Sequence, residues 1–211
     1  MSHDERRDCT VSCLFRVPVM STPGTIFVMY LTLACLPGLS IAVAVSPAPP
    51  PFMSCTDFHC DREREVQLTT RQWQNILALF TGTVSPEQER NRIRRAVALL
   101  EVYAGNITGT WRDLPRNRTG EGSQGQLDCI SESKNTTTYL ALLHNNGLLR
   151  WHDIEERQVR HTFVFNAHWS AVIRDRISGK RYAVDSWFRG NGYPPYIQPL
   201  QEWKSGRRFD R

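Results

Sequence analysis

One cysteine, one histidine and one aspartate occupy positions that suit nucleophilic catalysis. Cys129 follows Asp128, a residue type that commonly caps helices, so we expect Cys129 in the first turn of a helix. The free N–H groups and the positive dipole end at that point favour a thiolate over a thiol. A thiolate nucleophile also needs a base, and the base needs a group that orients it. His168 and Asp185 are the candidates for these two roles; the alternative for Cys129 is an inert, buried thiol.

His168 is the one histidine of the chain that lies within a strong strand pattern. That pattern covers 162–174, and a second run of β-branched and aromatic residues covers 181–188, so the two segments predict a hairpin. Because side chains alternate along a strand, His168 and Asp185 point to the same side in each register considered. A two-residue loop would leave them too far apart for a hydrogen bond. The dyad therefore predicts a loop of at least four residues around 175–179.

Helical patterns precede the strands. Apolar residues at helical spacing predict helices over 69–80, 85–105 and 128–145, with Gly105 ending the second. A loop rich in Gly, Arg and Asn, 111–126, leads into the third helix. Helices followed by an antiparallel sheet make α+β the expected fold class.

The first 45 residues differ from the rest. Residues 26–45 carry no charge and contain an Ala-Val-Ala tripeptide just before a proline-rich stretch, which is typical of an export signal. An uncleaved anchor is the alternative, because about twenty apolar residues can span a bilayer. We expect a signal peptide or membrane anchor over 1–45, a Pro-rich linker with a cysteine pair over 46–66, and a catalytic domain over 67–211. The protein is then exported, either periplasmic or secreted.

Export also determines how the cysteines are interpreted. Without the leader, the chain keeps Cys55, Cys60 and Cys129. Cys55 and Cys60 are close enough in sequence to form a disulfide in an oxidising compartment, which leaves Cys129 free. A metal site built from Cys55, His59 and Cys60 lacks an obvious fourth ligand, so no metal is expected. A thiol–disulfide protein based on this pair is a further alternative, with little support from its spacing.

The composition argues against a nucleic-acid partner. The formal net charge is +5, but the arginines are scattered, and no basic motif interleaved with aromatic residues accompanies them. With 40% hydrophobic residues, the chain can build a core, and disorder is not expected. Membrane contact is expected only through the N-terminal segment, if it stays uncleaved.

Four short segments resemble the transglutaminase-like superfamily, nearest to its exported bacterial cysteine peptidases: 128–129, 139–147, 168–173 and 182–185. The resemblance implies a papain-like fold, in which a cysteine opens a helix packed on an antiparallel sheet. It also implies Cys129 as nucleophile, His168 as general base and later acid, and Asp185 as the residue that orients the imidazole.

These roles imply acyl transfer through a thioester, with a protein or peptide of the cell envelope as substrate and no cofactor. Hydrolysis is favoured over protein cross-linking, and a non-catalytic binding module on the same fold is the other alternative. The N–H of Cys129 is the natural first donor to the oxyanion, and Gln126 or an amide near Gly125 is the candidate for the second. Trp169, Trp187 and Trp203 are candidates for lining the cleft, with a place in the core as the alternative.

Overall fold

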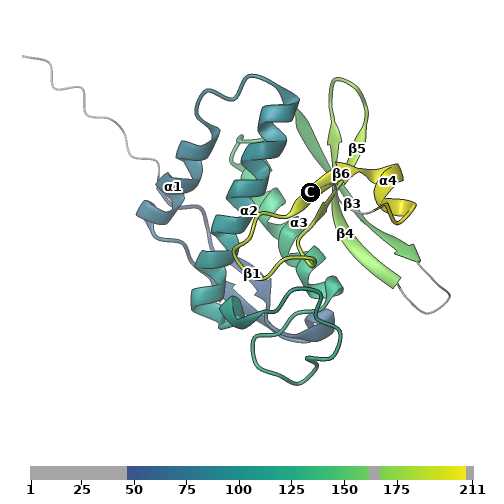
Figure 1. Cartoon of the computed structure of the whole chain (residues 1–211). Coiled ribbons are helices and arrows are strands. Elements are labelled where there is room, and N and C mark those ends of the chain that lie inside the picture. The colour runs from purple at the N-terminus through teal and green to yellow at the C-terminus, as the bar shows by residue number, and fades with distance from the viewer. Residues whose placement is uncertain (1–46, 162–166, 208–211) are drawn as a thin grey trace, which may run out of the picture. The chain divides into compact units, whose positions relative to one another are not determined.

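The structure, a computed structural model, describes residues 47–161 and 167–207, and Figure 1 shows its helices and strands. In the described residues the chain folds as α+β, which confirms the expected class. A small antiparallel sheet pairs β1 with β2, and a second antiparallel sheet has the strand order β3-β4-β5-β6. The elements, in chain order, are β1 (Phe52–Cys55), η1 (Phe58–Cys60), β2 (Glu63–Val66), α1 (Thr70–Phe80), α2 (Pro86–Thr108), η2 (Thr110–Arg112), α3 (Cys129–Asn145), β3 (His152–His161), β4 (Ala167–Asp175), β5 (Arg181–Asp185), β6 (Tyr196–Pro199) and α4 (Leu200–Lys204).

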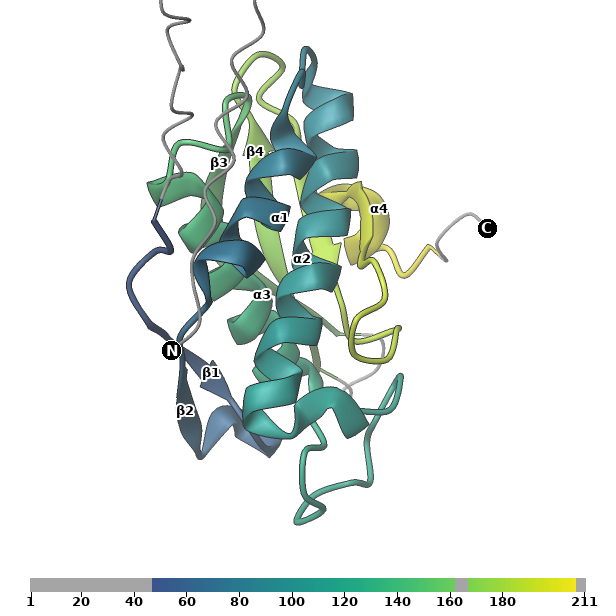
Figure 2. The same ribbon diagram turned by 90° about the vertical axis from the view of Figure 1, so that its left-hand side faces the viewer.

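Helices cover both faces of the four-stranded sheet. α3 packs on β4, α2 packs on α3, and α1 packs on α2, as Figures 1 and 2 show. The main core lies between these helices and the sheet; it includes Trp73, Ile93, Leu140, Ala171 and Val184. On the opposite face, a smaller cluster joins Val172 and Ala183 to Leu200 and Trp203 of α4. Burying each large apolar side chain contributes roughly 1.5–3 kcal/mol, so the two clusters fix the sheet between its helices.

The predicted helix starts at Thr69, Ser85 and Asp128 are confirmed as N-caps. Each side chain accepts a hydrogen bond from the backbone N–H three residues later, which satisfies one of the N–H groups that a helix start leaves unpaired. The predicted end of the second helix at Gly105 is wrong, because α2 continues to Thr108 and ends at Gly109, whose φ of 91° is left-handed. Gly105 serves close packing: a Cβ there would lie 2.9 Å from the backbone nitrogen of Trp111.

Two elements differ from the sequence expectation. The segment 46–66, expected to be a linker, contains the β1–β2 hairpin, which packs against α3. β3 was not expected at all. Its start is fixed by the fully buried Glu89 of α2, which accepts hydrogen bonds from the backbone N–H of Trp151 and binds His152 Nδ1 at 2.8 Å. No periodicity in the β3 segment signals these long-range contacts.

The expected leader, 1–45, lies outside the described residues. Within 47–161 and 167–207, no helix is both long enough and apolar enough to cross a membrane.

Candidate active site

Cys129 is the first residue of α3 and the free cysteine of the described residues. The N-cap Asp128 holds this turn, because its Oδ1 accepts a hydrogen bond of 2.9 Å from the Ser131 N–H. The Cys129 side chain is partly exposed, and its Sγ lies 3.9 Å from the carbonyl oxygen of Ala167, the first residue of β4. The nucleophile candidate therefore sits at a helix N-terminus, next to the strand that carries His168.

The β4–β5 hairpin brings His168 and Asp185 together. The Asp175 N–H donates to the Lys180 carbonyl at 2.8 Å, which closes a four-residue loop, and Ala171 pairs with Val184. This is the loop length that the dyad required. His168 Nε2 and Asp185 Oδ2 are 2.7 Å apart, and both side chains are almost completely buried.

Trp203 of α4 completes the support of the aspartate. Its indole Nε1–H donates to Asp185 Oδ2 at 2.7 Å, so the same oxygen holds both the imidazole and the indole. The Trp203 side chain is fully buried. Sequence reasoning named this residue only as a core or cleft aromatic; its partner could not be inferred because α4 has only five residues and a weak pattern.

Aromatic rings surround the imidazole and exclude water from it. The His168 ring centroid lies 4.8 Å from that of Trp187, 5.2 Å from Phe188 and 5.7 Å from Trp203. Burial by itself would lower the pKa of His168, but the hydrogen bond to Asp185, the Cys129 side chain and their negative charges raise it to about 9. The other ring nitrogen, Nδ1, has no hydrogen-bond partner among the described residues. The imidazolium is thus stabilised, with Cys129 close enough to contribute.

Cys129 and His168 open onto one cleft of about 420 Å³. Trp187 lines this cleft, as expected from the sequence. His59 and Asp128 also line it, and His59 Nδ1 lies 3.2 Å from Asp128 Oδ2. His59 is half-exposed at the cleft wall, and its place beside the cysteine pair was the only sequence signal for this position.

Two expected cleft residues do not line the cleft. The Gln126 carboxamide is used inside the preceding loop: its Nε2 donates to the Arg112 carbonyl at 2.6 Å, and its Oε1 accepts from the side chain of Asn117. Trp169 packs against Arg157 instead: the central carbon of the Arg157 guanidinium lies 5.1 Å from the centroid of the Trp169 ring. The backbone N–H of Cys129, at the first position of α3, remains the candidate oxyanion donor.

Arg157 is a further residue near the nucleophile that sequence reasoning missed. The pairing of β3 with β4 shifts between Glu155 and Gln158, and this bulge directs Arg157 toward the start of α3. Its Nη1 donates to the Ile130 carbonyl at 3.3 Å and to Ser133 Oγ at 3.0 Å. Burial lowers the pKa of Arg157, and the charge of Cys129 opposes this shift. Cys129 therefore lies in the field of two cationic side chains.

The expected disulfide is present between Cys55 and Cys60. It joins β1 to η1, and hydrogen bonds join both elements to α3: the Cys55 N–H donates to Asn135 Oδ1 at 2.7 Å, and the Cys60 N–H donates to Ser131 Oγ at 2.9 Å. Since η1 carries His59, the disulfide holds one wall of the cleft. Among the described residues, the carboxylate of Glu63 joins the two sulfurs in a group compact enough for a metal, but disulfide sulfurs offer no thiolate ligand.

Buried acids lie behind the cleft. Burial, opposed by the N–H of Gly192, raises the pKa of Glu101 to about 8, and burial raises that of Asp113 to about 6. Burial and the charges of these two neighbours raise the pKa of Glu132 in α3 well above its ordinary value. The neutral form is therefore favoured at pH 7 for Glu101 and Glu132.

The arrangement places a free cysteine at a helix N-terminus and a histidine paired with a buried carboxylate next to one open cleft. Comparisons with known proteins add no relative: no protein-family model matches the chain, and no curated protein or solved structure matches it significantly.

Proposed function

We propose that the protein is an exported cysteine hydrolase, a peptidase or amidase, that acts by acyl transfer through a thioester on Cys129. The observation that carries this proposal is the connected set Cys129, His168, Asp185 and Trp203, which ends in an open cleft at a helix N-terminus. We also propose that the core is papain-like and transglutaminase-like. A cysteine that opens a helix packed on an antiparallel sheet, with the histidine and aspartate on consecutive strands, supports this fold assignment.

In the first half of the reaction, the Cys129 thiolate attacks the carbonyl carbon of an amide. The C–S bond forms, and the developing oxyanion takes a hydrogen bond from the Cys129 N–H at the start of α3. The C–N bond then breaks as the His168 imidazolium gives its Nδ1 proton to the leaving amine. Asp185 binds Nε2, so the proton that moves is the one on Nδ1, the nitrogen that Asp185 does not hold.

In the second half, water resolves the thioester. Nδ1 of neutral His168 takes a proton from the water as its oxygen attacks the acyl carbon. The C–S bond breaks, and the products are a carboxylic acid and the regenerated thiolate–imidazolium pair. An amine in place of water would give cross-linking instead. We propose hydrolysis, and the amine-incorporation assay below separates it from cross-linking.

Alkylation tests the nucleophile without knowledge of the substrate. An ordinary free thiol has a pKa of about 8.5 and reacts slowly with iodoacetamide at pH 6–7. Cys129 should be labelled faster than such a thiol in this pH range. His168→Ala should slow this labelling at pH 6–7 by tenfold or more, about 1.4 kcal/mol, because it removes the cationic partner. His161→Ala is the matched control, since His161 is an exposed histidine at the end of β3. The proposal is refuted if the alkylation rate of Cys129 depends on pH as that of an ordinary thiol does and is unchanged by His168→Ala.

Turnover distinguishes the remaining alternatives. Peptides from the cell envelope, incubated with the protein, should gain new termini, and Cys129→Ala should abolish this while leaving the fold intact. Incorporation of a labelled primary amine into these peptides, without hydrolysis, would identify a cross-linking enzyme. If iodoacetamide labels Cys129 but the peptides are neither hydrolysed nor labelled with the amine, Cys129 is a reactive thiol and the protein is not the proposed hydrolase.

Export is tested at the N-terminus of the mature protein. The disulfide between Cys55 and Cys60 supports an oxidising compartment. Sequencing of protein from the envelope or secreted fraction should give a first residue near Val45. An intact residue 1 in the cytoplasmic fraction would contradict the proposed location.

A further inference from the structure

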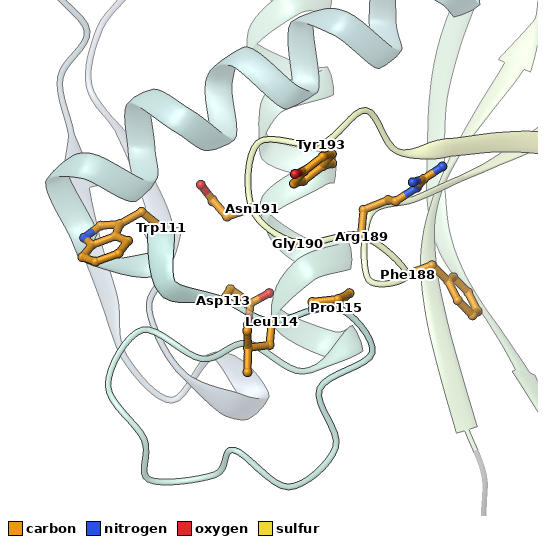
Figure 3. A pocket seen from close by; sticks show the side chains of 9 residues that line it. All are labelled: Trp111, Asp113, Leu114, Pro115, Phe188, Arg189, Gly190, Asn191 and Tyr193. Carbon is orange, nitrogen blue, oxygen red and sulfur yellow. The ribbon is translucent and has the colours of Figure 1, made fainter.

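A second concave surface lies beside the catalytic cleft and is not used by the proposed reaction. It has a volume of about 480 Å³ and is formed by two loops, one after α2 and one between β5 and β6. Figure 3 shows Leu114 and Pro115 on one side of it and Asn191 and Tyr193 on the other. We refer to this surface, lined by Trp111, Asp113–Pro115 and Phe188–Tyr193 without Gly192, as the side groove.

The side groove exposes large apolar side chains to water. Trp111 is 55% exposed, Leu114 63% and Tyr193 61%, although all three line the same hollow. Exposed apolar side chains are common singly, but a concave cluster of them is typical of a binding surface. Aromatic residues such as these also bind a partner at low entropic cost, because they have few rotatable bonds.

The side groove and the catalytic cleft share a wall. Trp187 lines the cleft, and the next residue, Phe188, lines the side groove while its ring packs against His168. On the opposite loop, Pro115 lines the groove and Asn117 lines the cleft. A chain seated in the cleft therefore has to cross only this short wall to enter the groove.

One backbone and one side-chain hydrogen bond connect the two loops that form this wall. The Arg116 N–H donates to the Trp187 carbonyl at 2.8 Å, and Trp187 Nε1–H donates to the Asn117 carbonyl at 3.1 Å. These bonds join the two loops between the groove and the cleft. The groove is thus positioned relative to Cys129 by the same loop that lines the active site.

Three arginines lie on or next to the side groove. The guanidinium of Arg112 stacks on Trp111 at 4.2 Å, that of Arg116 lies 5.5 Å from the Phe188 ring, and that of Arg189 stacks on Tyr196 at 4.5 Å. Within the described residues, none of these three arginines has a carboxylate partner within 4.0 Å.

The acid that lines the groove does not neutralise this charge. Asp113 is 5% exposed, and its Oδ1 accepts a hydrogen bond of 2.7 Å from the Leu127 N–H. The accessible surface is consequently apolar in its centre and positive at its edge, which complements an apolar side chain flanked by carboxylates.

We propose that the side groove binds a segment of the polypeptide substrate that carries a large apolar side chain next to acidic residues, close to the bond that Cys129 attacks. This inference rests on the proposed hydrolase. The apolar side chain enters between Leu114 and Tyr193, and the acidic residues meet Arg116 and Arg189. The groove thereby selects among amides that the catalytic residues alone would not distinguish.

Binding is measured on the full chain carrying Cys129→Ala, so that no turnover is required. The probe is a blocked nonapeptide with two phenylalanines and four glutamates; one control peptide replaces glutamate by lysine, and a second replaces phenylalanine by serine. In ¹⁵N NMR, the probe should shift the indole N–H signal of Trp111, assigned through Trp111→Phe. The signal of Trp151, which lines neither concavity, should stay unchanged. Each control peptide should bind about tenfold more weakly or worse.

Substitutions in the groove locate the binding. Leu114→Ser and Arg189→Glu should each weaken the probe about tenfold. Ile177→Ser and Arg71→Glu are the matched controls, because these residues are also exposed but lie outside the groove, and they should leave the affinity unchanged. A probe that leaves Trp111 unshifted, or groove variants that bind like the parent, would overturn the inference.

The two proposals fail separately. An unreactive Cys129 together with a shifted Trp111 signal would refute the hydrolase and retain the groove as a binding surface. If the protein hydrolyses peptides, and Leu114→Ser and Arg189→Glu prefer the same peptides as the parent, the proposed role of the side groove is refuted while the hydrolase is retained.

Discussion

Replacing Asp185 by asparagine should lower the pKa of His168 while keeping the fold. The side chains have nearly the same shape, and the amide oxygen can still accept from His168 Nε2 and Trp203 Nε1, the two partners of Oδ2. The other oxygen, Oδ1, has no partner among the described residues, so the new NH₂ group displaces no existing hydrogen bond. The variant therefore removes mainly the negative charge.

The structure sets the size of the effect. A rise in the pKa of His168 from 6.5 to about 9 corresponds to about 3 kcal/mol of preference for the imidazolium. Burial favours the neutral imidazole, and Asp185 and Cys129 together outweigh this effect and favour the imidazolium. Loss of the carboxylate should remove roughly 1–2 kcal/mol of it, which brings the pKa of His168 to about 8 or lower.

The imidazole C–H signal of His168, followed by NMR from pH 5 to pH 10.5, measures this pKa directly. Asp153→Asn is the matched control, because Asp153 is a partly exposed carboxylate of β3 that pairs with Arg174 and Arg176 instead. Activity of Asp185→Asn at neutral pH should fall less than the roughly 10⁴-fold seen for the equivalent change in a Ser-His-Asp triad, since a thiolate needs less help from a base.

Stability gives an independent check. Because the pKa of His168 is higher in the folded state, its contribution is fully present below about pH 6.5 and is lost as the pH rises through about 9. The free energy of unfolding should therefore fall less between pH 6 and pH 10 in Asp185→Asn than in the parent, by about 1–2 kcal/mol. If His168 in the variant still titrates near 9, Asp185 does not hold its proton and the triad assignment fails.

Three further changes test the supports of the site. Replacing Cys55 and Cys60 by serine should lower the free energy of unfolding in urea by about 2 kcal/mol, the chain-entropy value for so short a loop; an unchanged midpoint would mean that the bridge does not constrain η1. Trp203→Phe keeps a buried ring but removes the donor to Asp185, so the free energy of unfolding should fall by about 1.5–3 kcal/mol. Alkylation of Cys129 should also slow. An unchanged alkylation rate would show that the Trp203 indole does not position the site. Burial raises the pKa of Glu101 to about 8, so its neutral form contributes stability that is present below about pH 4.5 and lost as the pH rises through 8. The melting temperature of Glu101→Gln should therefore fall less than that of the parent over this pH range. An identical pH dependence of the two melting temperatures would refute the raised pKa.

Local physical chemistry in the sequence was enough to locate the starts of the three long helices and the His168–Asp185 pair. Asp128 caps α3 with its own side chain, so the position of Cys129 at the helix start follows from neighbours in the chain. The shared face of His168 and Asp185 follows from strand alternation, and the four-residue loop follows from the distance that a hydrogen bond allows. Each of these inferences depends on residues within one element or one hairpin.

Long-range contacts decided the rest. β3 begins where buried Glu89 binds the backbone of Trp151, 62 positions away. Gly105 looked like a helix end because glycine commonly follows one, but it is there to admit the backbone of Trp111. Partners so far apart in sequence leave no local pattern.

The same limit applies inside the site. The pairing of Asp185 with His168 could be predicted from the sequence, whereas the second partner of Asp185, Trp203, depends on how α4 docks on the sheet. His59 reaches the cleft only because the disulfide and the side chains of α3 hold η1 against the helix start. The sequence by itself determined which groups can do the chemistry, since residue type and local geometry carry that information. Only the tertiary structure decided which groups surround them, because packing between distant segments sets burial, charge and access.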